Sequence, residues 1–136
     1  MLGARVLAFP APGKSPPYPI SDITGLQTAL NNKSDKYLSF VTVGGASKTL
    51  ALADDSVVQE TTAGAAITVP ADGSVNFTVG TVIPICWLSG AQPSVVAAGG
   101  VTIQDATKLK VGTQYKFAFL VKRAANNWLF TGDTAA

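Results

Sequence analysis

Carboxylates are the side chains in this sequence that come nearest to offering acid–base chemistry. Asp54-Asp55 is the only adjacent pair, and glycosidase-type catalysis needs two carboxylates about 5–10 Å apart. Consecutive strand residues point to opposite faces, and this pair follows the apolar run LALA. The pattern therefore indicates a turn and not a catalytic dyad. The full set of acids is Asp22, Asp35, Asp54, Asp55, Glu60, Asp72, Asp105 and Asp133.

Nucleophilic and metal chemistry lack their usual residues. The chain has no histidine, so a Ser-His-Asp or Cys-His arrangement is impossible. Ser47-Lys48 is a Ser–Lys pair, but such neighbours are common by chance. An all-oxygen metal site would draw on Asp54, Asp55 and Asp72, and no EF-hand loop is present. We therefore expect no catalytic residues, no metal site and no cofactor, and hence no enzyme.

Other conspicuous residues also have structural interpretations. Cys86, the only cysteine, predicts a small buried hydrophobe. Trp87 and Trp128 predict core residues. Gly44-Gly45 and Gly99-Gly100 carry no phosphate-loop motif and predict turns.

Composition restricts the class of partner. The chain has 136 residues, of which 47% are hydrophobic and 13% are charged, whereas about 25% charged is typical. This shortage of charge suggests that much of the surface faces other protein. A net charge of +2 is too weak to argue for nucleic acid or an anionic membrane. We expect neither partner, and no stretch approaches the ~20 apolar residues of a membrane span.

Residues 1–19 predict an extended, proline-rich arm. Five of the eight prolines lie within ten residues, at positions 10, 12, 16, 17 and 19, which excludes a continuous helix. The segment is more apolar than a solvated tail usually is. It is not read as a signal peptide, because Arg5 interrupts its apolar run. The expected attachment residues are Leu2, Val6, Leu7, Phe9 and Tyr18.

Residues 20–36 predict one short helix. Ser21, Asp22 and Thr24 suit its N-terminus. Ile23, Leu26 and Leu30 follow the spacing i, i+3, i+7, which gives a narrow apolar seam. A helix this short needs a partner surface. The seam packs either on the chain's own β domain or on copies of itself.

Residues 37–136 predict a β domain. Apolar and β-branched residues gather in about ten short runs separated by Gly, Asp, Asn and Pro. No helix-length pattern lies between the runs, which disfavours βαβ units. We expect an antiparallel β-sandwich or jelly-roll-like barrel without an internal repeat.

Two of these runs alternate clearly. In SVNFTV (74–79), a predicted strand, Val75, Phe77 and Val79 share one face. In QYKFAFLV (114–121), the face that starts at Tyr115 is mostly aromatic, while the other face continues to Lys122. We expect the aromatic face to form core and the lysine face to be solvated or subunit-facing.

The segment ISDITGLQTALNNKSD (20–35) resembles a short motif, roughly D-[VI]-T-G-L-Q-x-A-L-x-x-K-x-D, of tail fibres and other virion appendages of tailed bacteriophages. The runs that follow it, such as ITVP (67–70) and FTVGTVI (77–83), resemble the β module often found beside that motif. The resemblance implies homotrimers, with Ile23, Leu26 and Leu30 at the trimer interface, and it supplies no catalytic residues.

The chain has one copy of the motif and one β domain, without repeated shaft segments. This favours a capsid-decorating protein, a cement protein or head fibre, attached to the major capsid protein or another virion protein through its arm. The alternative is a tail fibre or receptor-binding appendage that recognises a host surface glycan or protein. In either case the expected location is the virion, assembled in the host cytoplasm.

Overall fold

The computed structural model describes residues 38–136, which form one unit. The expected arm over residues 1–19 and the expected helix over residues 20–36 lie outside the described residues. Almost all regular structure in the described part is strand, and its one helical element is a 3-10 turn, η2 (Leu52–Asp54).

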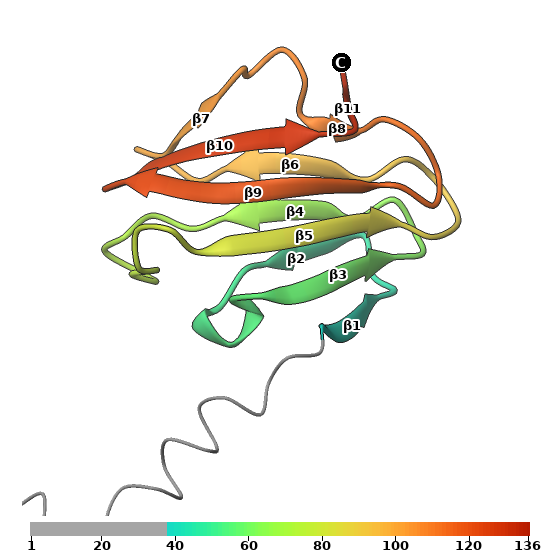
Figure 1. Cartoon of the computed structure of the whole chain (residues 1–136), viewed down its shortest axis with the longest axis horizontal. Helices are drawn as coiled ribbons and strands as arrows, with labels where there is room; N and C mark the ends of the chain where they lie inside the picture. Colours follow the sequence, from blue (N-terminus) through green and yellow to red (C-terminus); the bar gives the residue numbers. More distant parts are fainter. Residues whose placement is uncertain (1–37) are drawn as a thin grey trace, which may run out of the picture. The chain divides into compact units, whose positions relative to one another are not determined.

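Two sheets make up the domain (Figure 1). Sheet A has six strands, in the order β1 (Ser39–Val43), β3 (Val57–Thr61), β5 (Val82–Trp87), β9 (Phe117–Ala124), β10 (Asn127–Gly132) and β7 (Thr102–Gln104). Sheet B has five, in the order β11 (Thr134–Ala135), β8 (Lys110–Val111), β6 (Ser94–Ala97), β4 (Ala66–Val69) and β2 (Ser47–Thr49).

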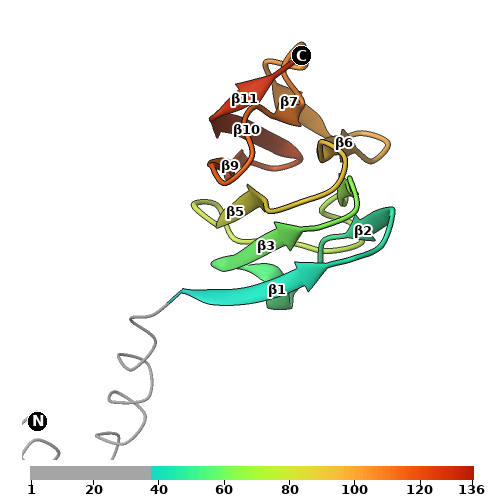
Figure 2. The same ribbon diagram turned by 90° about the vertical axis from the view of Figure 1, so that its right-hand side faces the viewer.

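The first six strands alternate between the sheets, so the chain winds through three coils. In sheet A, Ser39 pairs with Val57, 18 residues later, and Gln59 pairs with Ile85, 26 residues later. In sheet B, β2, β4 and β6 stack in the same way. All four of these pairings are parallel, because each strand meets the equivalent strand of the next coil. Figure 2, turned by 90°, shows β1, β3 and β5 stacked in this order.

Glycine makes the tight corners of the coils possible. Gly90, after β5, has φ +72, and a Cβ there would lie 2.3 Å from the Thr62 carbonyl oxygen of the previous coil. Gly64 has φ +69, and its Cβ would lie 2.7 Å from the Ala91 Cβ. A larger residue at either corner would have to push two coils apart.

The last strands close the stack in antiparallel fashion. β9 pairs with β5, and β10 pairs with β9 through a hairpin whose turn residue Asn126 has φ 49. Asparagine tolerates this left-handed conformation. β8 pairs with β6 and with β11, while β7 pairs in parallel with β10.

The core fills the space between the sheets. Sheet A contributes Ile83, Ile85 and Leu120, and sheet B contributes Ile67 and Val95. Trp128 from β10 packs among them, with the Phe77 ring edge-on at 5.4 Å between ring centroids. The core is thus built from side chains of alternating strand positions, as two facing sheets require.

The prediction of a mostly β, two-sheet domain is confirmed in this coarse form, but the antiparallel prediction is wrong. Five of the nine strand pairings are parallel. Parallel pairing needs a crossover, and here a strand of the opposite sheet replaces the helix of a βαβ unit. The sequence has no internal repeat, and the successive coils of the backbone have unequal lengths of 18 and 26 residues.

Two local predictions are also wrong. Residues 74–79 form no strand, although Phe77 of this segment is buried. In β9 the expected faces are reversed, since Ala118, Leu120 and Lys122 are buried and Phe117 is exposed. The aromatic side of this strand therefore points away from the core.

The reversed orientation of β9 predicts the relative cost of two substitutions. Leu120→Ala should lower the free energy of unfolding by about 2–5 kcal/mol, because it opens a cavity in the core. Phe117→Ala should lower it by less, since Phe117 is exposed within its own chain and stacks on Phe119. Urea denaturation at one protein concentration measures both values. A larger loss of stability from Phe117→Ala than from Leu120→Ala would contradict the orientation of β9.

Candidate functional site

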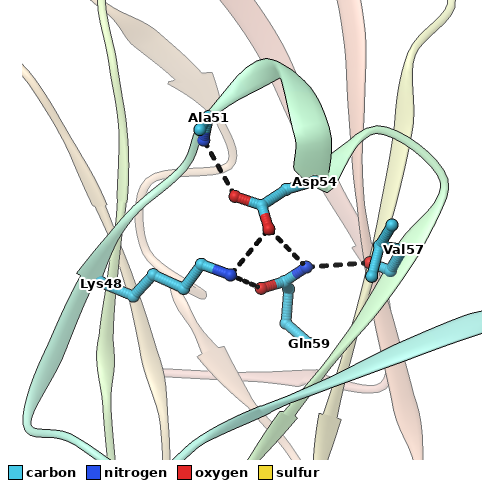
Figure 3. Close-up of polar contacts among 5 residues, drawn as sticks. All are labelled: Lys48, Ala51, Asp54, Val57 and Gln59. Atoms are coloured by element: carbon cyan, nitrogen blue, oxygen red, sulfur yellow. Dashed lines mark hydrogen bonds and ion pairs between the residues drawn. The ribbon is translucent and has the colours of Figure 1, made fainter.

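The most densely connected polar cluster joins Lys48, Asp54 and Gln59 (Figure 3). Lys48 Nζ donates to Asp54 Oδ1 at 2.7 Å and to Gln59 Oε1 at 2.5 Å. Gln59 Nε2 donates to the Val57 carbonyl at 3.0 Å and to Asp54 Oδ1 at 3.3 Å. Asp54 Oδ2 accepts the Ala51 N–H at 2.9 Å. Every polar atom of these three side chains that faces the cluster has a partner.

Strand geometry explains why this cluster faces inward. Lys48 pairs with Ile67, a core residue of the next coil, so its side chain points between the sheets. Gln59 pairs with Ile85, another core residue, and is fully buried. η2 then places the Asp54 carboxylate between them. The cluster therefore fills the core at the β1–β2 end, where the apolar rows stop.

This arrangement stabilises the fold. A buried carboxylate or amine is costly unless it is paired and hydrogen-bonded, and the three side chains satisfy one another. Lys48, in sheet B, donates to the Asp54 carboxylate and to the amide oxygen of Gln59, in sheet A. The three side chains therefore link sheets A and B.

A second cluster centres on Asp72, in the loop between β4 and β5. The carboxylate accepts a short hydrogen bond from Lys122 Nζ and a bond from the Asn126 N–H at 3.0 Å. Asn126 returns the contact, because its Oδ1 accepts the Asp72 N–H at 2.8 Å. The loop and the β9–β10 hairpin, 54 residues apart in sequence, are thus joined reciprocally.

Lys122 itself is almost completely buried. Its Nζ lies 5.7 Å from the centroid of the Trp128 ring, a cation–π distance. The Trp128 Nε1–H is the one buried side-chain polar atom without a hydrogen-bond partner among the described residues. Trp128 is thus held in the core by packing against Lys122 and Phe77.

Two groups have perturbed pKa values. The hydrogen bond from Lys122 lowers the pKa of Asp72, and the Asn126 N–H adds to this effect, while partial burial opposes it. Burial raises the pKa of the Cys86 thiol, and the nearby Glu60 carboxylate raises it further. Cys86 therefore stays a protonated, buried thiol, as predicted from its apolar run.

The residues singled out for possible chemistry lie apart from one another. Asp55 accepts from Ser56 Oγ at 3.0 Å and from Thr81 Oγ1 at 3.3 Å, whereas Asp54 binds Lys48. The two adjacent carboxylates thus have separate partners. Ser47 is exposed while Lys48 points inward, so these two neighbours form no Ser–Lys pair.

Both tryptophans occupy the predicted kind of position. Trp128 is fully buried, and Trp87 is half-buried against the core with its Nε1 donating to the Gly90 carbonyl at 3.2 Å. The buried roles of Lys48 and Lys122 were missed. Their positions in the sequence could have indicated these roles, because residues two apart in a strand share a face. Lys48 precedes the core residue Leu50 by two positions, and Lys122 follows the core residue Leu120 by two.

The predicted interface residues lie outside the described residues. These are Ile23, Leu26 and Leu30 of the trimer seam, and Leu2, Val6, Leu7, Phe9 and Tyr18 of the attachment arm.

No ligand-sized cavity and no group of acids and cysteines able to hold a metal ion occurs in residues 38–136. The same residues contain no helix long and apolar enough to cross a membrane. No protein-family model and no curated protein matches the chain.

The first cluster predicts unequal effects of substituting the two adjacent acids. Asp54→Ala should lower the free energy of unfolding by about 2–4 kcal/mol, because it strands Lys48 and Gln59 beside the core. Asp55→Ala should cost less than about 1 kcal/mol, since its partners are hydroxyl groups near the surface. Chemical denaturation of both variants provides the comparison, and equal losses would contradict a bracing role for Asp54.

The second cluster predicts a dependence of stability on pH. Because folding lowers the pKa of Asp72, the carboxylate stabilises the fold above its unfolded pKa of about 4, and this contribution is lost as the pH falls through the folded pKa. Asp72→Asn should therefore be less stable than the wild type at pH 6, and the difference should shrink at pH 3. Urea midpoints of the two proteins at both pH values measure this. A difference that stays constant or grows toward pH 3 would rule out the assignment.

Proposed function

We propose that this chain is a structural virion protein that decorates an assembled phage capsid as a cement protein or head fibre. The segment over residues 20–35 supports this through its similarity to virion appendages. The observation that carries the proposal within the described domain is that its two inward-pointing lysines are each held by a carboxylate. Both lysines are therefore engaged within the fold, which favours a structural role for them over a chemical one.

In this proposal the arm over residues 1–19 attaches the protein to the shell. Leu2, Val6, Leu7, Phe9 and Tyr18 supply the apolar contacts. Proline already restricts the arm, so docking costs less backbone entropy than docking a flexible tail. The partner is the major capsid protein or another protein of the shell.

Three copies are proposed to assemble about the segment over residues 20–36. The apolar seam of Ile23, Leu26 and Leu30 is narrow and the segment is short. A helix of this kind needs a partner surface to be stable. Three such seams on a common axis would bury nine apolar side chains, each worth roughly 1.5–3 kcal/mol before entropic costs.

Deleting residues 1–18 should abolish binding to capsids while leaving the β domain folded. The reason is that the deletion removes the proposed attachment residues but none of the residues of the two sheets. Co-sedimentation with capsids that lack the protein measures binding, and circular dichroism checks the fold.

The copy number per particle separates the capsid role from the alternative. A capsid-decorating protein should be present in tens to hundreds of copies, whereas a tail fibre or receptor-binding appendage should be present in a few trimers.

In the deletion experiment, full capsid binding by the chain that lacks residues 1–18 would refute the role of the arm.

A further inference from the structure

Much of the outer face of sheet A is apolar. Six side chains of this face point away from the core and are exposed or half-buried: Phe40, Val82, Phe117, Phe119, Val121 and Leu129. The register joins them across the strands, since Phe40 pairs with Val58, Phe119 with Pro84, and Val121 with both Val82 and Leu129. Val58 and Pro84, the strand partners of Phe40 and Phe119, are themselves buried, and the polar residues Thr42, Glu60 and Thr131 also lie on this side of the sheet. We call this side of sheet A the A face.

The outer face of sheet B has the opposite character. Its outward positions include Ser47, Thr49, Thr68 and Lys110, with Val96 as the exposed large hydrophobic residue. An antiparallel or mixed sheet with one solvated side is ordinarily polar on that side. Sheet A follows this pattern less than sheet B does, so the A face is the side better suited to contact protein.

The start of the described domain indicates which protein it contacts. β1 is the edge strand of sheet A, and Leu38 and Phe40 at this edge are 58% and 57% exposed. Only one residue separates Leu38 from the segment over residues 20–36. Helices that pack together lie about 8–10 Å apart, and two residues of chain span at most about 7 Å. In a trimer held by residues 20–36, Leu38 of each copy therefore lies within reach of the other two.

We propose that the A face, beginning at Leu38 and Phe40, is the surface through which the β domains of three copies of this chain contact one another. The inference rests on the trimer of the proposed function and adds which side of the β domain turns toward the axis. Sheet B then faces outward, where its hydroxyl groups and Lys110 meet solvent.

The size of the A face fits an interface that works only between tethered chains. Five strands at about 4.8 Å spacing and about 20 Å of strand length give roughly 500 Å² for each copy. A stable interface between free proteins buries about 800 Å² for each partner. Tethering through residues 20–36 raises the effective concentration to the millimolar range, where a smaller contact suffices.

The test compares two exposed strand residues in the full chain. Phe40→Asp places a charge on the A face, and Val96→Asp places one on sheet B, where Val96 is 43% exposed. Sedimentation velocity over a dilution series measures trimer dissociation, and circular dichroism confirms that both variants fold. Phe40→Asp should raise the dissociation constant of the trimer at least tenfold, and Val96→Asp should change it less than twofold.

Three outcomes would overturn the proposal: an unchanged trimer with Phe40→Asp, an equal loss with Val96→Asp, or a monomeric wild type. A further variant, Leu26→Asp with Leu30→Asp, separates the two levels of the argument. If it dissociates the trimer while Phe40→Asp does not, the trimer stands and the A face is not its interface. A monomeric wild type that still binds capsids would overturn the interface and leave the decorating role intact.

Discussion

Parallel hydrogen bonding between successive coils is the constraint on which the rest of the domain depends. Each strand of the first three coils finds its partner about one coil away along the chain. A coil therefore has no stable hydrogen-bonded neighbours until the next coil is in place. The pairing register also fixes which side chains share the core. A one-residue slip of a strand would turn every one of its side chains to the other face.

Two inward-pointing lysines, each paired with a carboxylate, link different parts of the domain through their side chains. At the β1–β2 end, the cluster of Lys48, Asp54 and Gln59 joins the two sheets. On the other side of the stack, Asp72 ties the β4–β5 loop to the hairpin that closes sheet A. The side-chain bonds to Asp72 add to backbone hydrogen bonds between the end of the same loop and β9, from the Gly80 N–H to the Lys122 carbonyl at 2.8 Å and from the Lys122 N–H to the Thr81 carbonyl at 2.9 Å.

Much of the strand content was predictable, while the topology was not. The runs around Val58, Ile67, Ile85, Val95 and Leu120 are apolar and β-branched, and each lies in a strand. Pairing partners are decided by contacts between residues 18–28 positions apart, which local alternation does not encode. Because the coil lengths are unequal, the sequence also has no fixed period that would indicate the coils.

The orientation of β9 shows why a hydrophobic pattern can mislead when both faces of a strand carry apolar residues. Residues 115–121 alternate between a mostly aromatic face and a face with alanine, leucine and lysine. The usual rule places the aromatic face inside. In this domain, Asp72 and Trp128 make a buried lysine acceptable, and the smaller side chains fit between the sheets. The candidate clusters were missed for the same reason, since both are centred on lysines.

The coil corners differ between the two sides of the stack, and this difference bears on how the scaffold can be modified. On one side Gly64 and Gly90 are wedged against the neighbouring coil. On the other side a Cβ at Gly73, Gly80 or Gly99 would meet no atom within 4 Å, and the loops there account for much of the variation in coil length. Peptide epitopes or affinity tags grafted next to Gly99 would extend into open space, whereas grafts at Gly64 or Gly90 would separate the coils. The turn at Gly99 is therefore the better place to display foreign sequence.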